Sequence, residues 1–113
     1  MINNKKIVFI CSPYKGDISK NTTRAKRYGR YAISEGAVPI IPHLMYPQFL
    51  DESDTRERAI GLEMGLELLG ICHEIWVFGD IISPGMVAEI NVAGENKIPI
   101  KYHDISCRPL VKE

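Results

Sequence analysis

The sequence predicts a single α/β domain whose core is an open parallel β-sheet with helices on both faces. Short, continuous apolar runs alternate along the chain with longer segments of helical periodicity. Parallel strands, which are buried on both faces, need such continuous runs and need a helical crossover between successive strands. The 113 residues suffice for one domain with one core, so we assign residues 1–113 to a single domain.

The composition is that of an ordinary globular protein, with 45% apolar and 25% charged residues. Fourteen Lys and Arg balance fourteen Asp and Glu, so no net charge attracts the chain to a nucleic acid polymer or a membrane, and we expect neither as a partner. The basic residues within 24–30 are interpreted as a solvated helix face. No signal peptide is recognised and no apolar run approaches the ~18 residues of a membrane span, so we expect a cytoplasmic protein.

Cysteine and histidine spacing gives no sign of a disulfide framework or a metal site. The three cysteines are an odd number without CxxC spacing, which indicates reduced thiols. The three histidines are equally scattered, and no pair has ligand spacing. We therefore expect no metal and no cofactor.

The first half of the chain reads as strand, helix, strand and helix. A first strand at 5–11 ends in a turn-rich loop at 12–17, and a helix at 21–35 ends before Gly36. The second strand, 37–41, contains Pro39, which cannot donate to a β ladder and therefore places this strand at an edge.

Residues 42–53 are predicted to be a loop, and a second helix covers 54–69. Asp54 and Glu57 have the spacing of a capping box at its start. Its apolar face is wider than one sheet can cover, so we expect burial against another subunit and hence a homo-oligomer.

The second half continues with a strand at 74–78, a helix from Pro84 to about residue 95, and a fourth strand at 98–102. Ser83 is a good N-cap for this helix, and proline fits the first helical position because its missing N–H costs nothing there. The tail from His103 is assigned no element.

Right-handed crossovers favour strand order 2-1-3-4, a flavodoxin- or Rossmann-like arrangement that leaves room for a fifth strand. In that order strands one and three are neighbours, and the chain leaves them in opposite directions. Ligands bind in open α/β sheets at such a point, outside the carboxyl ends of the strands. We therefore expect a small-molecule site between the loops 12–17 and 79–85.

Several side chains of this region can take part in a site. Gly85 leaves the backbone bare near a helix N-terminus, where free N–H groups favour an anion and help to keep Glu89, one turn further on, ionised. Glu89 is either an exposed helix glutamate or a site carboxylate, and its position at the switch point favours the second. The expected binding residues are Ser12, Tyr14, Lys15, Gly16, Ser83, Gly85 and Met86, with His43 after the second strand.

Residues 11–16 (CSPYKG) and 83–90 (SPGMVAEI) together resemble the nucleoside 2-deoxyribosyltransferase superfamily, which includes 2'-deoxynucleoside 5'-phosphate N-hydrolases. The likeness spans roughly residues 7–102. It is nearest to the small uncharacterised bacterial and phage members, with Pro39, Arg58 and the run 76–79 (WVFG) in similar places.

The resemblance implies a glutamate nucleophile at Glu89 and a phosphate contact at Ser83. An acidic residue on the preceding helix would fall on Glu67. Trapping the anomeric carbon of a sugar as a glycosyl-enzyme needs a carboxylate and a group that assists the leaving base. Asp80, Glu67 and Tyr14 are the candidates for that group. The structural alternatives are a turn residue for Asp80, a surface residue for Glu67 and a packing role for Tyr14.

Two function classes follow. The first is cleavage or transfer of an N-glycosidic bond in a (deoxy)nucleoside or nucleoside 5'-monophosphate, with water or a second base as the acceptor. The alternative is a non-catalytic nucleotide or nucleotide-sugar binding module. Characterised superfamily members typically have glycines two residues before and after the glutamate. Val87 and Asn91 stand at those positions and favour the binding module, whereas Glu89 beside Gly85 favours the enzyme.

Overall fold

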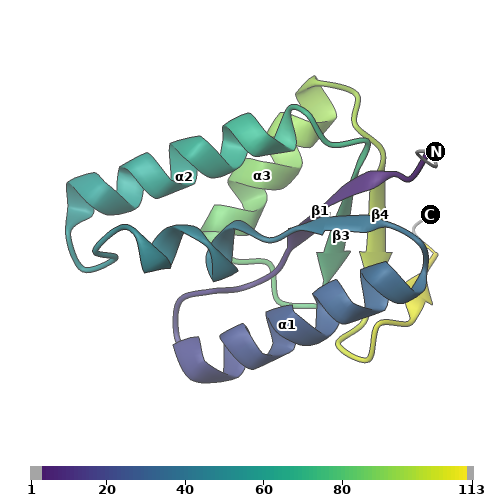
Figure 1. Cartoon of the computed structure of the whole chain (residues 1–113), viewed down its shortest axis with the longest axis horizontal. Helices are drawn as coiled ribbons and strands as arrows, with labels where there is room; N and C mark the ends of the chain where they lie inside the picture. Colours follow the sequence, from purple (N-terminus) through teal and green to yellow (C-terminus); the bar gives the residue numbers. More distant parts are fainter. Residues whose placement is uncertain (1–3, 112–113) are drawn as a thin grey trace.

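Five strands form one sheet in the order β2-β1-β3-β4-β5 (Figure 1). The structure is a computed structural model that describes residues 4–111. Strands β2, β1, β3 and β4 pair in parallel, and β5 is antiparallel to β4. The predicted class and the order 2-1-3-4 are confirmed. The strands are β1 (Ile7–Cys11), β2 (Val38–Ile40), β3 (Glu74–Phe78), β4 (Ile100–His103) and β5 (Pro109–Leu110).

The fifth strand is formed by the tail, to which the sequence analysis assigned no element. Its two residues pair with Tyr102 and His103, and both are exposed. A strand this short, with no buried face, leaves no periodic signal in the sequence. Asp104 closes the preceding turn, since one of its carboxylate oxygens accepts from the backbone N–H groups of Ser106 and Arg108, each at 2.9 Å.

Three helices cover the two faces of the sheet. Helix α1 (Ile18–Ser34) packs on one face, and α2 (Thr55–Leu69) and α3 (Pro84–Glu95) lie on the other (Figure 1). Helix α1 begins three residues before the predicted start because Asp17 caps it, accepting the N–H of Lys20 at 3.1 Å. The predicted loop after β2 contains two single 3₁₀ turns, η1 (Pro42–Leu44) and η2 (Tyr46–Gln48).

The predicted capping box of α2 is half wrong. Asp54 caps the helix by accepting the N–H groups of Arg56 and Glu57. Glu57 does not return the bond to Asp54, because its Oε1 instead accepts the N–H of Asp51 at 2.8 Å. The carboxylate thereby ties the helix start to the loop before it.

Strand alternation divides the core into two clusters. Successive side chains of a strand point to opposite faces of the sheet. Val8 and Ile10 of β1 therefore pack with Tyr28 of α1, whereas Phe9 and Cys11 join the cluster under α2 and α3. Helix α2 itself is only partly covered, and Ile60 and Leu62 remain exposed. Within residues 4–111, no helix is long and apolar enough to cross a membrane.

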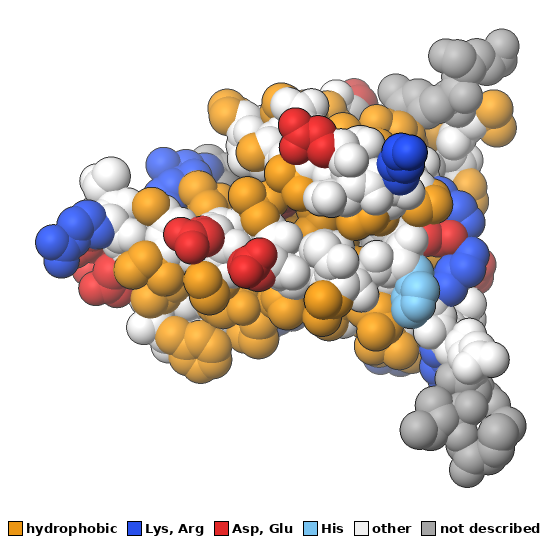
Figure 2. Space-filling view, turned by 90° about the horizontal axis from the view of Figure 1, so that it is seen from above, with side chains coloured by type: hydrophobic (Ala, Val, Ile, Leu, Met, Phe, Trp, Pro, Cys, Tyr) orange, Lys and Arg blue, Asp and Glu red, His pale blue; other side chains and the backbone are white. Residues whose placement is uncertain are grey.

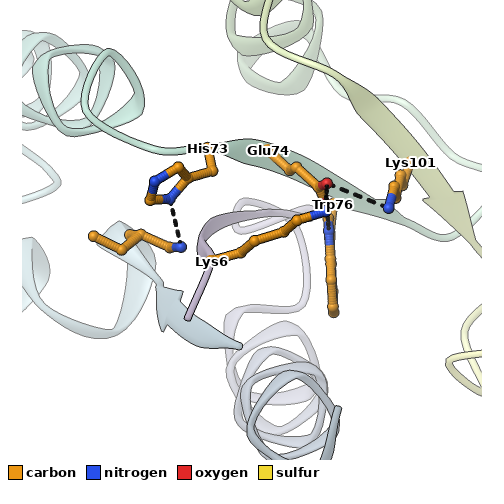
Figure 3. A network of polar contacts seen from close by, with 6 residues as sticks. Lys6, His73, Glu74, Trp76 and Lys101 are labelled. Carbon is orange, nitrogen blue, oxygen red and sulfur yellow. Dashed lines mark hydrogen bonds and ion pairs between the residues drawn. The ribbon is translucent and has the colours of Figure 1, made fainter. Parts of the chain in front are cut away.

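A buried glutamate ties three neighbouring strands together at the amino end of β3 (Figure 3). The Glu74 carboxylate accepts from Lys6 Nζ at 2.6 Å, from Lys101 Nζ at 3.3 Å and from Trp76 Nε1 at 2.8 Å. Beside it, His73 Nδ1 accepts the N–H of Ile7 at 2.8 Å. Although burial raises the pKa of Glu74, these donors outweigh it and hold that pKa below its usual value. The carboxylate is therefore a satisfied structural group.

We expect Glu74→Gln to lower the free energy of unfolding by roughly 1.5–3 kcal/mol at neutral pH, the range for hydrogen bonds to charged groups. A carboxyl whose pKa is lowered on folding stabilises the protein above its usual pKa of 4.5, and this contribution is lost as the pH falls through the lowered value. Urea unfolding from neutral to acid pH should therefore show the difference between wild type and variant shrinking. A difference that is constant with pH would contradict this role.

Candidate active site

A cavity of about 270 Å³ opens beside the start of α3, at the carboxyl ends of β1 and β3. It is surrounded by the loop after β1, the two 3₁₀ turns, the loop before α2, α2 as far as Gly65 and the first turns of α3. Its polar and charged lining side chains are Tyr14, Lys15, His43, Tyr46, Glu52, Arg58, Ser83 and Glu89. The switch point of the sheet therefore carries a pocket.

Glu89 is the most deeply placed carboxylate of this cavity. It lies in the second turn of α3 and is only 7% exposed. Its Oε1 is buried without a hydrogen-bond partner among the described residues. The thiol of Cys11, at the end of β1, lies beside the carboxyl group. One oxygen of this buried acid therefore has no donor among the described residues to stabilise its charge.

Burial raises the pKa of Glu89 to about 7, and the Cys11 thiol opposes this shift. Burial thus works against the expected help of the helix start in keeping Glu89 ionised, because desolvation disfavours the carboxylate. Burial and the nearby carboxylate also raise the pKa of Cys11 well above its usual range, so the thiol keeps its proton and can donate it. At neutral pH the acid is poised between its two protonation states.

Tyr14 and His43 form one wall. Their rings stack with centroids 5.0 Å apart, and His43 Nε2 lies 3.1 Å from the carbonyl oxygen of Ser12. Because a carbonyl can only accept, Nε2 carries the proton of the ring. Burial lowers the pKa of His43, the hydrogen bond to Ser12 opposes this, and the Arg58 cation lowers it further, so the ring is neutral at pH 7.

Tyr14 keeps its phenolic proton. Burial and the Glu52 carboxylate raise the pKa of Tyr14, against the opposing effect of Arg58. These charges act on Tyr14 from the far side of the cavity, where η2 leads into α2. Tyr14 is therefore a protonated hydroxyl, able to donate a hydrogen bond within the cavity.

The start of α3 lines the cavity with backbone groups and carries no charged side chain there. Ser83 Oγ accepts the N–H of Met86 at 3.3 Å, which caps the helix. A Cβ added at Gly85 would meet no atom within 4 Å, so this residue presents bare backbone. The first turn of α3 therefore lies open to the cavity at its positive end.

The structure brings most of the sequence-predicted residues together. Those that line the cavity are Tyr14, Lys15, His43, Ser83, Gly85, Met86 and Glu89. Ser12 is buried beside it, and Gly16 lies exposed in the turn before α1. Asp80 lines neighbouring cavities instead, and Glu67 is exposed on α2 outside the lining.

The sequence analysis missed the contribution of α2 and of the loop before it. Arg58, Gly61, Leu62 and Gly65 line the cavity together with Glu52 and the Tyr46-Pro47 pair. The signal was present in the sequence, because positions 58, 61, 62 and 65 share one face of a helix. That face is charged at one end and has two residues without side chains, which leaves space beside α3.

Val87 and Asn91 stand where the resembled superfamily typically has glycine. Both residues are exposed and border a separate cavity beside β4 and β5, on the other side of α3 from Glu89. Neither belongs to the lining of the Glu89 cavity. Their side chains therefore do not fill the space in front of the carboxylate.

Residues 6–103 match the family model described as a domain of unknown function, DUF7768. The chain belongs to this family. No curated protein sequence matches the DUF7768 chain. A solved structure of a 2-deoxyribosyltransferase from Bacillus psychrosaccharolyticus is similar to it, with a TM-score of 0.73 and 11% sequence identity. The alignment covers 95% of this chain and 77% of that one. The DUF7768 domain thus has the fold of that transferase.

We expect Glu89→Gln to stabilise the folded protein above pH 7 by roughly 3 kcal/mol, which corresponds to a pKa raised from 4.5 to about 7. In that interval the folded state holds a proton that the unfolded chain has lost, so the free energy of unfolding of the wild type falls as the pH rises. The glutamine variant lacks this slope, and below pH 4.5 the two proteins should be nearly equal. Urea unfolding at several pH values measures the difference, and parallel curves would show that Glu89 has an ordinary pKa.

Proposed function

We propose that the DUF7768 domain cleaves or transfers the N-glycosidic bond of a (deoxy)nucleoside or nucleoside 5'-monophosphate, with Glu89 as the nucleophile. The observation that carries this proposal is the buried Glu89 carboxyl, one oxygen of which has no partner among the described residues, in a cavity of about 270 Å³. The volume is near the lower end of ligand pockets, which run from ~300 to ~1,000 Å³. A single nucleoside-sized ligand suits such a space.

The reaction needs the carboxylate form of Glu89. A carboxylate oxygen attacks the anomeric carbon, and the bond from that carbon to the base nitrogen breaks with its electron pair going to the base. Water or the nitrogen of a second base then attacks the same carbon and releases the carboxylate, and the proton that this acceptor loses replaces the one taken up by the departing base. Hydrolase and transferase differ only in this second step, so both readings keep the same roles for the protein residues.

Tyr14 is our choice for the group that assists the departing base. It lines the cavity with its hydroxyl protonated, and it stacks on His43, which fixes the ring. Asp80 and Glu67 lie outside this lining and receive no role in the proposal. The phenol can hydrogen-bond to the base nitrogen as negative charge develops there.

The competing reading is a binding module that retains the fold without catalysis. It drew support from Val87 and Asn91 in place of glycines. Because these two side chains border a different cavity, they leave the space beside Glu89 open. This placement, together with a titrating carboxyl, favours the enzyme.

We further propose a homo-oligomer in which a second copy covers α2. Ile60 and Leu62 are 47% and 40% exposed on this helix, and Phe49 in the preceding loop is 71% exposed. The face seen in Figure 2 shows hydrophobic side chains gathered around α2. Leu62 also lines the Glu89 cavity, so a second copy seated here would lie at its rim.

Glu89→Gln should fold and lose turnover by roughly 10³-fold or more, since the amide cannot form the glycosyl ester. Incubation with a panel of nucleosides and monophosphates, with chromatography of the released base, identifies the substrate and measures the loss. Glu63→Gln, an exposed carboxylate on α2, is the matched control and should keep wild-type rates. The value of kcat/KM should fall as the pH drops below about 7, because Glu89 then becomes protonated and cannot attack. Turnover by Glu89→Gln at the wild-type rate would contradict the assignment of Glu89 as the nucleophile. If wild type and variant both bind a ligand and neither turns it over, the non-catalytic binding module is favoured.

The wild-type protein should scatter light as at least a dimer at micromolar concentration. Ile60→Glu should shift it toward the monomer, because a carboxylate placed in an apolar contact must lose its hydration. Size-exclusion chromatography with light scattering gives both masses. A wild-type monomer would count against the oligomer while leaving the Glu89 assignment untouched.

A further inference from the structure

A second cavity, of about 230 Å³, lies on the α1 side of the sheet. It is bordered by the loop after β1, the first turns of α1 and the segment that follows β3. Tyr28 and Phe78, which belong to the core cluster under α1, line its inner end. Only Lys15 belongs to the lining of both this cavity and the Glu89 cavity. We call it the α1 cavity.

Ser12 presents an unsatisfied hydroxyl on this side. Side chains alternate along β1, so Ser12 continues the series of Val8 and Ile10, which face α1, rather than that of Cys11. Ser12 is 1% exposed and lines the α1 cavity, and its Oγ is buried without a hydrogen-bond partner among the described residues. Its backbone carbonyl bonds to His43 of the other cavity, so the hydroxyl alone remains unexplained.

Three cations without a partner border the same cavity. Lys15, Lys20 and Arg24 line it, and none of them takes part in an ion pair within residues 4–111. Lys20 and Arg24 are one turn apart on α1, so they share a face. Of the two lining carboxylates, Asp17 is occupied as the N-cap of α1, which leaves Asp80.

Tyr28 follows one turn after Arg24 and adds a hydroxyl. Burial raises the pKa of Tyr28, and the Arg24 cation opposes this from close by, so the phenol keeps its proton beside the guanidinium. Donors therefore outnumber free acceptors in the α1 cavity. An unsatisfied buried hydroxyl together with unpaired Lys and Arg side chains matches the oxygens of a phosphate group, which only accept and carry negative charge.

We propose that the α1 cavity binds the phosphate group of a small phosphomonoester, held by Ser12, Lys20 and Arg24. The site is distinct from the Glu89 cavity and does not rest on the proposed N-glycosidic chemistry. Two ligands share this chemistry: the 5'-phosphate of a substrate that reaches past Lys15, and a separate phosphorylated effector.

Isothermal titration calorimetry with inorganic phosphate at constant ionic strength tests the site directly. Wild type should show saturable binding, and Arg24→Gln and Ser12→Ala should each weaken it by about ten-fold or more, as expected for loss of a hydrogen bond to a charged group. Arg30→Gln is the matched control, because Arg30 is an exposed arginine of α1 outside the cavity lining. Glu89→Gln should bind phosphate like wild type.

Ser12→Ala also checks that the hydroxyl is unsatisfied in the free protein. Its melting temperature should equal or exceed that of wild type, since an unpartnered buried hydroxyl costs stability. A clear loss of stability would mean that the hydroxyl is already bonded within the protein, and this would overturn the argument from Ser12.

Competition identifies the source of the phosphate. If saturating inorganic phosphate weakens binding of a nucleoside monophosphate but not of the nucleoside, the site holds the substrate's phosphate. If the nucleoside monophosphate and the nucleoside both bind unchanged while inorganic phosphate fills the α1 cavity, the site binds a separate phosphorylated effector. Absence of saturable phosphate binding to wild type, or equal loss in Arg24→Gln and Arg30→Gln, would overturn the proposal, whatever the outcome of the turnover assays.

Discussion

Burial of the Glu89 carboxyl against the end of β1 is the constraint on which the site depends. Two parts of the fold produce it: the parallel pairing of β1 with β3, and the capped start of α3 that follows β3. Together they hold the acid beside Cys11, away from solvent and short of hydrogen-bond donors. Desolvation then sets the protonation equilibrium near neutrality. Lys15 and Arg58 line the same pocket, yet burial still dominates the pKa of Glu89.

Glu74 and Glu89, both buried, behave in opposite ways because they lie at opposite ends of the sheet. Glu74, at the amino end of β3, is surrounded by two lysines and an indole N–H, and its pKa is lowered. Glu89, at the carboxyl end of the sheet, has among the described residues only the Cys11 thiol beside it to lower its pKa, and burial raises that pKa. The first carboxylate stabilises the fold, whereas the second costs stability at neutral pH. Unfavourable burial of an ionisable group in a cleft is the usual mark of a functional site.

Most of the fold followed from local patterns in the sequence. Continuous apolar runs indicated the strands, Ser83-Pro84 marked a helix start, and Pro39 placed β2 at an edge, where the structure has it. The site was only partly predictable. A switch point in the sheet indicates which loops surround a site, but it does not indicate how deeply each side chain is buried. Glu52 comes from a loop without clear periodicity, whereas Arg58 lies on a predicted helix face, and only tertiary packing places both beside the cavity that Tyr14 lines. The pKa of Glu89 depended on burial, which spacing along a helix does not reveal.

Ser12 connects the two cavities through different atoms of one residue. Its carbonyl oxygen accepts from His43 on the Glu89 side, and its hydroxyl lies on the α1 side. Strand alternation enforces this division, because the pleat sends the side chain away from the face that Cys11 occupies. Removing the hydroxyl therefore leaves the carbonyl bond to His43 in place, so the chemistry of one cavity can be altered without disturbing the wall of the other. Of the three cations that line the α1 cavity, Lys20 and Arg24 do not line the Glu89 cavity, so these donors stay apart from the desolvated acid and do not pair with it.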